Sequence, residues 1–251
     1  MQRKLRVWDL PTRLFHWALA ACVAGSLVSV NLGGNAVAWH FRFGYAILAL
    51  LLFRLVWGFA GPRYARFASF PPRPAAALGY LRRAASEPDR PGHSPLGALS
   101  VYALLLALAV QVGTGLFAND AIMWDGPLKN LVSNATSDSL TRLHKINRFV
   151  LVGLVLLHLA AIAFYALVLR RNLVRPMITG DLPMDALVAA DATGSLASRS
   201  AATPGSPRAT DAHRPVRDDA AVRLKALAIL VACAALVWGT ISLAGRAGGG
   251  V

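Results

Sequence analysis

The chain has 251 residues, of which 56% are hydrophobic and only 15% are charged, and its mean hydropathy is +0.50. This composition is too apolar for an ordinary soluble domain. The net charge of +14 would suit a protein that binds nucleic acid, but the basic residues gather at the ends of apolar segments, where membrane proteins place them. We therefore expect an integral membrane protein in contact with lipid, with no nucleic acid as a partner.

Five apolar segments are long enough to cross a bilayer, which takes about 20 residues at about 1.5 Å per residue. They cover residues 14–32, 41–60, 96–117, 146–169 and 224–244. The sequence therefore predicts an all-α fold. Its first four helices form a bundle, and the fifth is an additional C-terminal transmembrane helix.

The distribution of Lys and Arg predicts how these helices are oriented. Basic residues precede the first segment, fill the stretch between the second and third, and follow the fourth, whereas the other connections contain few. Because basic loops stay on the cytoplasmic side of a membrane, we expect the N-terminus and residues 61–95 in the cytoplasm. Residues 118–143 are then expected on the outside.

Changes of composition divide the chain into three parts. Residues 1–176 contain the first four apolar segments and form the expected transmembrane domain. Residues 177–222 are rich in Ala, Ser, Thr, Pro, Asp and Arg. Such a stretch cannot bury enough apolar surface to offset the entropy of ordering, so a flexible cytoplasmic linker is expected. Residues 223–251 hold the fifth transmembrane helix, which has no histidine, and a short periplasmic tail.

Four histidines, His16, His40, His144 and His158, lie in or beside the apolar segments, where an ionisable side chain usually has a function. His144 and His158 are 14 residues apart, which is about 21 Å along a helix and only about 40° around it. They therefore share one helix face at two depths. With the orientation given above, His40 lies level with His144 near the outer face, and His16 lies level with His158 near the inner face.

Two facing histidines provide both axial ligands of a b-type haem iron, and helical bundles build cofactor sites in this way. A single intramembrane histidine can instead hydrogen-bond a neighbouring helix, and zinc is another candidate metal, but two pairs at two depths favour two haems. We therefore predict a four-helix di-haem bundle in which His16, His40, His144 and His158 bind the haem iron. Such ligation suits electron transfer, and no residue is assigned as catalytic.

Four further residues are candidates for cofactor binding. Arg54 lies 14 residues after His40 and so points the same way at the depth of the inner haem, where it either pairs with haem propionates or extends to the cytoplasmic interface. Arg42 and Arg148 lie beside the outer pair and either pair with propionates or anchor the interface. His93, at the cytoplasmic start of the third segment, either lines a quinone site or caps that helix.

Several motifs in order carry a resemblance to a known family. They are VWDLPTRLFHW at residues 7–17, His40 followed by Gly44-Tyr45, RLVWG at 54–58, ARF at 65–67, GHSPLGA at 92–98, TGLF at 114–117, Leu143-His144 and His158. Together they resemble bacterial cytochrome b561 and the b-type cytochrome subunit of nickel–iron hydrogenases, over about residues 5–176. The resemblance implies a multi-pass protein of the bacterial inner membrane, with a di-haem core that exchanges electrons with the quinone pool. It gives the haem-ligand role to the same four histidines.

The predicted function is electron transport in a respiratory chain, between quinone or quinol and a periplasmic redox protein such as a cytochrome c or a hydrogenase. Whether the chain is itself an enzyme stays open, because some similar proteins oxidise superoxide and pass the electron to quinone. In that alternative, Lys129, Arg142, Lys145 and Arg148 steer the anion to the outer haem. A third alternative is a haemless membrane anchor, which the absence of a b-type absorption spectrum would favour.

Overall fold

The computed structural model describes residues 4–83, 92–183 and 215–248. Within these ranges, five helices are long and apolar enough to cross a membrane, as the sequence predicts. They are α1 (Leu10–Leu32), α2 (Val37–Ala60), α4 (Pro95–Gly115), α5 (Asn134–Leu167) and α8 (Ala220–Gly248). The shorter elements are β1 (Lys4–Arg6), η1 (Gly34–Ala36), η2 (Arg63–Ala65), η3 (Phe67–Ser69), α3 (Pro74–Arg83), η4 (Lys129–Leu131), α6 (Val174–Thr179) and β2 (Asp181–Pro183).

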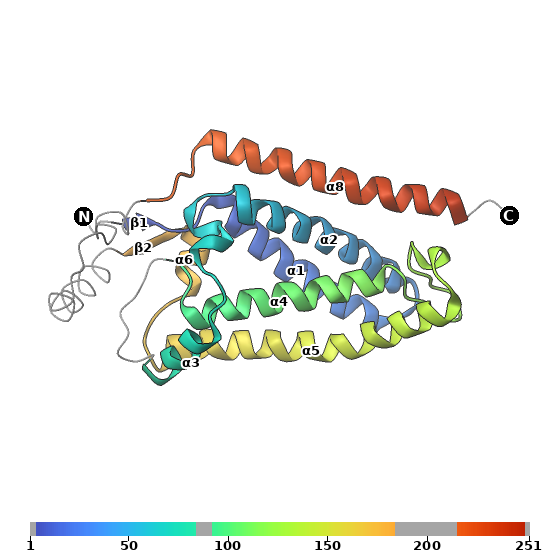
Figure 1. Ribbon diagram of the computed structural model, residues 1–251, viewed down its shortest axis with the longest axis horizontal. Coiled ribbons are helices and arrows are strands. Elements are labelled where there is room, and N and C mark those ends of the chain that lie inside the picture. Colours follow the sequence, from blue (N-terminus) through green and yellow to red (C-terminus); the bar gives the residue numbers. More distant parts are fainter. Residues whose placement is uncertain (1–3, 84–91, 184–214, 249–251) are drawn as a thin grey trace. The chain divides into compact units, whose positions relative to one another are not determined.

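The chain divides into two compact units, of which the bundle unit comprises Leu14–Trp57, Tyr102–Leu159 and Leu224–Val251. Its α1, α2, α4 and α5 run alongside one another in Figure 1 and share one apolar core. The buried members of this core are Ile47, Ala107, Leu108, Val112 and Leu151, and Leu19, Cys22, Val23, Leu48, Leu51, Leu104, Leu154 and Val155 pack against them. This packing confirms the predicted four-helix bundle.

Helix α1 begins at Leu10 because the amides of its first turn find partners. Asp9 accepts hydrogen bonds from the Thr12 amide at 2.9 Å and from the Thr12 hydroxyl at 2.8 Å, which makes it the N-cap. The Leu10 amide donates to Asp218 at 3.2 Å, and Pro11 has no amide hydrogen to satisfy. This start places His16 in the second turn of α1.

Helix α5 begins at Asn134, 12 residues before the predicted apolar segment 146–169. Its N-terminus is capped by Ser133, whose hydroxyl accepts from the Thr136 amide at 3.2 Å. Hydropathy finds only the part of a helix that crosses the membrane, and the first turns of α5 are polar, so the sequence placed them in a loop. Because α5 is continuous, His144 and His158 lie on one helix, as the 14-residue spacing assumed.

The end unit comprises Met1–Arg13, Gly58–Val101 and Ala160–Arg223. In it, β1 pairs antiparallel with β2 and places Leu5 opposite Leu182, a small departure from an all-α chain. Its buried cluster contains Leu5, Val7, Trp8, Tyr64 and Val216. The predicted linker therefore does not begin at residue 177, because α6 and β2 continue the ordered structure to Pro183. Residues 184–214 of that linker lie outside the described residues.

A carboxylate joins two segments of the end unit that are far apart in the sequence, residues 6–10 and 218–223. The side chain of Asp218 is 6% exposed and accepts hydrogen bonds from Arg6 at 2.8 Å and Arg223 at 3.1 Å, besides the Leu10 amide. Nearby, Arg6 also pairs with Asp181 at 2.6 Å. We call these four side chains, Arg6, Asp181, Asp218 and Arg223, the clasp.

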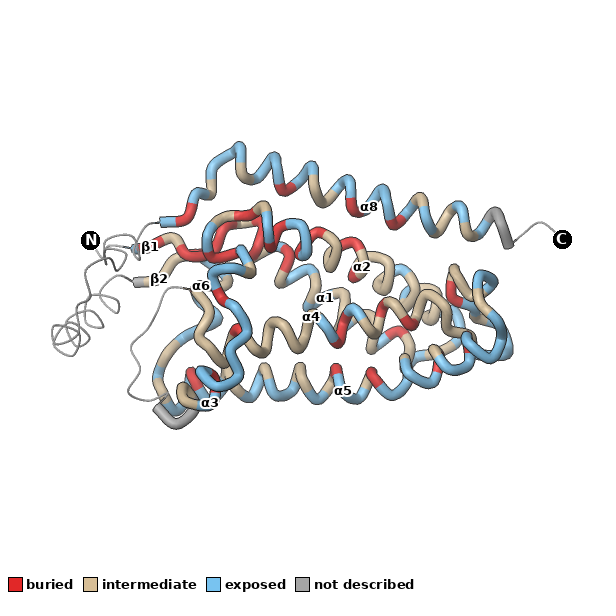
Figure 2. Tube along the Cα trace, in the orientation of Figure 1, coloured by how far each residue is buried: buried red, intermediate tan, exposed pale blue. Residues whose placement is uncertain are grey.

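Helix α8 buries one narrow face and exposes the rest. Its buried residues Ala226, Cys233 and Val237 follow a spacing of seven and four, which places them on one side of a helix. The other sides show large apolar residues, with Leu236 59% and Trp238 75% exposed. Figure 2 shows this alternation along α8. An apolar exposed surface of this kind suits a helix in contact with lipid.

Candidate functional site

The outer pair of histidines lies inside the bundle unit, with His40 on α2 and His144 on α5. Their ring centres are 6.1 Å apart, and the ring planes are nearly perpendicular at 89°. A metal–imidazole bond of about 2 Å, together with about 1.15 Å from nitrogen to ring centre, places two opposed ligand rings about 6.3 Å apart. The observed separation therefore matches that of two imidazoles sharing one metal ion.

Hydrogen bonds fix the proton of each outer histidine on Nδ1. Nδ1 of His40 lies 3.1 Å from the carbonyl oxygen of Ser26 and 2.9 Å from its hydroxyl. Nδ1 of His144 lies 2.8 Å from the carbonyl oxygen of Gln111. Since a carbonyl only accepts, each Nδ1 carries the hydrogen and each Nε2 keeps its lone pair. Metal-bound histidines have this arrangement, in which the second nitrogen donates to a backbone carbonyl.

The lone pair on Nε2 of His144 faces a donor in the structure. The side-chain amide nitrogen of Gln111 donates to it at 3.1 Å. The amide oxygen of Gln111 accepts from Asn147 at 2.8 Å, which fixes the orientation of the amide. A metal ion at Nε2 takes the position of this donor, so metal binding requires the Gln111 side chain to turn.

The absence of a side chain at Gly115 also helps to set the orientation of the His144 ring. A methyl group at Gly115 would lie 2.9 Å from Cε1 of the His144 ring, so only glycine leaves room for this ring orientation. At Gly44, one turn after His40, a methyl group would meet nothing within 4 Å, which leaves free space beside that histidine. From the sequence, Gly44 is expected to let a flat macrocycle approach the helix closely, and Gly115 is expected to serve helix–helix packing.

The inner pair, His16 on α1 and His158 on α5, also lies in the bundle unit and is partly buried. The two side chains lie within range of an electrostatic interaction. Nδ1 of His16 is buried and has no hydrogen-bond partner among the described residues. A buried polar atom of this kind usually indicates a missing ligand or ion. Phe15, next to His16 on α1, contacts Phe53 of α2, whose ring stacks on that of Trp57, and all three are buried.

The three candidate arginines lie in different surroundings. Arg54 is 4% exposed and lies close enough to Tyr102 for its charge to act on that residue, so its side chain stays inside the bundle. Arg42 and Arg148 stack over neighbouring aromatic rings instead, with their guanidinium carbons 4.6 Å from the centre of Trp39 and 4.8 Å from that of Phe149. These two contacts suit anchors at a membrane interface.

His93 belongs to the end unit and lies among aromatic rings. Its ring centre is 4.1 Å from that of Phe70 and 4.8 Å from that of Trp8. His93 lies two residues before α4. The hydroxyl of the next residue, Ser94, accepts a hydrogen bond from the Gly97 amide in the first turn of α4 at 3.1 Å. The capping role that the sequence offered for His93 therefore belongs to Ser94.

Comparison with known families adds one finding. The family model described as prokaryotic cytochrome b561 matches residues 7–180, which is more than half of the chain. The chain belongs to the prokaryotic cytochrome b561 family. It is therefore a multi-pass membrane b-type cytochrome for electron transfer, and family membership implies haem b. Searches of curated proteins and of solved structures found no match.

The bundle of this cytochrome b561 suits the haem that the family implies. The 6.1 Å ring separation, the Nδ1 tautomers of the outer pair and the space at Gly44 all agree with histidine-ligated haem. The sequence missed Ser26 and Gln111, whose carbonyls contact Nδ1 of His40 and His144. Gln111 carried a usable signal, because an amide inside an apolar segment is as unusual as a histidine there.

Proposed function

We propose that this cytochrome b561 carries electrons across the cytoplasmic membrane between the quinone pool and a periplasmic redox protein of the cytochrome c or hydrogenase type. The observation that carries the proposal is the 6.1 Å separation of the His40 and His144 rings, with a second histidine pair on the same bundle. One pair serves one haem, and two pairs at two depths form an electron path across a bilayer.

Each chain group has a defined task in this proposal. His40 and His144 hold the outer haem b, and His16 and His158 hold the inner one. The haems, when bound, would supply one-electron chemistry at iron. The carbonyls of Ser26 and Gln111 keep the ligand protons on Nδ1. The buried charge of Arg54 offsets the negative charge of haem propionates.

The proposed orientation places the N-terminus in the cytoplasm and the outer pair near the periplasm. It rests on the positive-inside rule, since the connection between α2 and α4 is rich in arginine. On the cytoplasmic side, we place the quinone-reactive region near His93, whose ring contacts those of Trp8 and Phe70. Aromatic faces and an imidazole provide the stacking surface and the hydrogen-bond partner that a quinone ring needs.

In the superoxide alternative, Lys129 is one of the cations that steer the anion to the outer haem. The contacts of Lys129 do not support this role. Its ammonium group lies 3.9 Å from the Asp125 carboxylate, which offsets its charge. Electron transfer with quinone is the one function that we propose.

Reduction by quinol tests the proposal. The purified protein is mixed with a short-chain ubiquinol or menaquinol in a stopped-flow instrument, and the b-type haem absorption is followed. We expect both haems to be reduced within the turnover time of a respiratory chain, and the His93→Ala variant to be reduced at least tenfold more slowly with an unchanged spectrum. Haems that neither quinol reduces would contradict the proposal.

A further inference from the structure

The connection from α4 to α5 contains a tight turn, Asn119–Asp125, that its own side chains hold in place. One carboxylate oxygen of Asp120 accepts hydrogen bonds from the amides of Ile122, Met123 and Trp124 at 2.9, 2.8 and 2.8 Å. Ala121 has a left-handed backbone with φ of 60°, which costs energy for a residue with a side chain. The turn is therefore built to hold one conformation.

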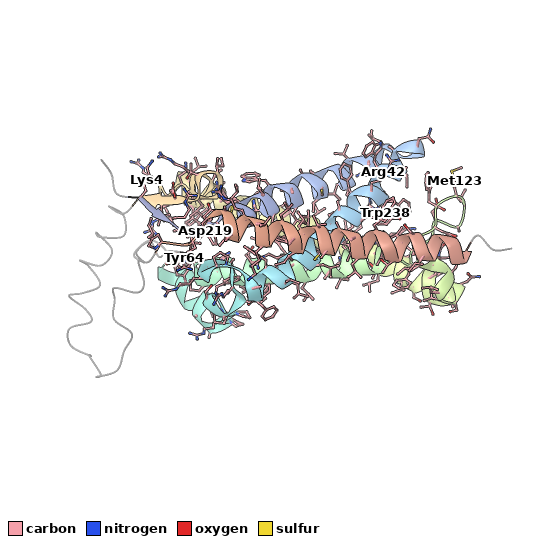
Figure 3. All side chains as sticks on the ribbon, turned by 90° about the horizontal axis from the view of Figure 1, so that it is seen from above. Lys4, Arg42, Tyr64, Met123, Asp219 and Trp238 are labelled. Atoms are coloured by element: carbon pink, nitrogen blue, oxygen red, sulfur yellow. The ribbon has the colours of Figure 1, made fainter. Side chains whose placement is uncertain are left out.

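The held turn displays two apolar side chains at its tip. Ile122 is 90% exposed and Met123 is 76% exposed, and Figure 3 shows Met123 at the tip of the loop. Single exposed apolar residues are common on proteins, but adjacent ones on a rigid, strained turn indicate a surface made for contact. We call Ile122 and Met123 the apolar tip.

Aromatic rings connect the turn to the outer histidine pair. The Trp124 ring, next to the apolar tip, lies 5.9 Å from the Phe41 ring at an angle of 34°. The Phe41 ring lies 6.2 Å from that of His40. On the other side, the Gly126 amide donates to the Ala118 carbonyl at 2.7 Å, which fixes the turn to the end of α4. A partner at the apolar tip is thus separated from the outer pair by two packed rings.

The charge around the tip indicates the chemistry of the occupant. Asn119, at the start of the turn, contacts Asp138 at 3.0 Å and pairs with Asp125 in a β-bridge. Because Lys129 lies 3.9 Å from the Asp125 carboxylate and offsets its charge, Asp120 and Asp138 are the acidic groups of this region. The hydrogen bonds from the amides of Trp124, Ile122 and Met123 keep the pKa of Asp120 below its usual value, so this carboxylate stays charged. Acidic groups are repelled by anionic lipid headgroups and attract a basic protein surface.

We propose that the apolar tip is the docking site for a soluble electron-transfer protein whose redox centre lies behind an apolar patch bordered by lysine or arginine. This inference rests on the proposed function, and it names the contact through which the periplasmic partner exchanges electrons. One electron passes for each encounter, and the protein that loses it is oxidised as the other is reduced. Small, weakly bound interfaces with an apolar centre and a charged rim are typical of redox encounters.

The test separates docking from reaction with quinone. The protein is first reduced by ubiquinol, and the reduced form is then mixed with a basic c-type cytochrome or, in a parallel series, with an acidic one. In the double variant Ile122→Ser with Met123→Ser, we expect the second-order rate with the basic probe to fall at least tenfold, while reduction by ubiquinol is unchanged. Leu131→Ser, at a residue that is 67% exposed in η4, is the matched control and should keep the wild-type rate.

Two further measurements test whether docking needs the held turn and whether the partner surface is basic. Asp120→Ala removes the hydrogen bonds that hold the turn but keeps both apolar side chains. Because docking needs the held conformation, this variant should also react more slowly with the basic cytochrome. The wild-type rate with the basic probe should fall with salt and exceed that with the acidic probe. An unchanged rate in the double variant, or faster reaction with the acidic probe, would overturn the docking site, whereas failed ubiquinol reduction would overturn the proposed function.

Insertion of the tip into lipid is the competing outcome. It is tested with Ile122→Cys carrying a bimane label, in a chain whose native thiols are removed by Cys22→Ala and Cys233→Ala. In proteoliposomes, quenching by aqueous iodide supports docking of a soluble protein. Quenching by nitroxide-labelled lipid would show membrane insertion and overturn the proposal.

Discussion

Gly115 is the residue at which the smallest change should have the largest effect on the outer haem. A methyl group there would lie 2.9 Å from the His144 ring, whereas at Gly113, half a turn away on α4, it would meet nothing within 4 Å. We expect Gly115→Ala to lower the outer haem content severalfold, because the ligand ring must move. Gly113→Ala should keep the wild-type content. Pyridine haemochrome assays on both variants measure this, and equal haem loss in the two would contradict the account.

Ser26 should tune the outer haem without being essential for it. Its hydroxyl and carbonyl both lie within hydrogen-bond distance of Nδ1 of His40, and acceptors at this nitrogen make the ligand more basic and stabilise ferric iron. Ser26→Ala removes one acceptor, so the outer haem potential should rise and haem affinity should fall by up to about tenfold. Thr240→Ala, which removes a hydroxyl bonded to carbonyls of its own helix α8, is the control. A lowered potential in a spectroelectrochemical titration would count against this role.

The histidines proposed as haem ligands stand out in the sequence, whereas the residues that contact their side chains do not. A histidine in an apolar segment stands out because burying it is costly, and a 14-residue interval on one helix fixes a common face. The contact of Ser26 with His40 joins α1 and α2, and that of Gln111 with His144 joins α4 and α5. Which helices face each other depends on packing across the whole bundle, which periodicity along one helix does not determine.

Among the elements, β1, the start of α1 and the start of α8 depend on the single carboxylate of Asp218. Replacing it by Asn removes the charge that pairs with Arg6 and Arg223. Hydrogen bonds to charged groups contribute about 1.5–3 kcal/mol, so we expect the Leu10 amide to exchange hydrogen at least tenfold faster in Asp218→Asn. Asp219→Asn is the matched control, because Asn caps α8 as well as Asp does. Hydrogen exchange with mass spectrometry checks both variants.

The same contacts predict how the clasp responds to pH. Burial raises the pKa of Asp218, but hydrogen bonds from Arg223 and the Leu10 amide and the charges of Arg223 and Arg6 outweigh it, so the pKa lies below 3.8. A lowered pKa in the folded state means that the stabilisation is complete above pH 3.8 and is lost as the pH falls through the folded value. Exchange at Leu10 should therefore accelerate in that acidic range, beyond the intrinsic pH dependence. The Asp218→Asn variant should show no such additional step.

Sequence patterns predicted the long elements well and the short ones poorly. The five spans follow from apolar length alone. The start of α5 did not, because its first turns are polar and depend on the Ser133 cap. The pair β1–β2 joins residues 4–6 to residues 181–183. Strands of three residues have no periodicity that a sequence can show, and their formation depends on the contacts of Arg6 with Asp181 and Asp218.

In the whole molecule, each helix of the bundle has a separate task in the proposed electron path. Helix α5 carries one ligand of each pair, and α1 and α2 carry the other two. Helix α4 carries no ligand, but its Gln111 carbonyl and Gly115 position His144. Helix α8 lies beyond residue 180, where the family match ends, and it has no histidine. The haem sites are therefore expected to depend on α1, α2, α4 and α5.

A redox titration that resolves the individual haems tests the central claim, that the four histidines work as two specific pairs. It is carried out on the purified wild-type protein and on the single alanine variants of His16, His40, His144 and His158. The account predicts two components in the wild type, loss of one of them in both His40→Ala and His144→Ala, and loss of the other in both His16→Ala and His158→Ala. Removal of different components by His40→Ala and His144→Ala would contradict it.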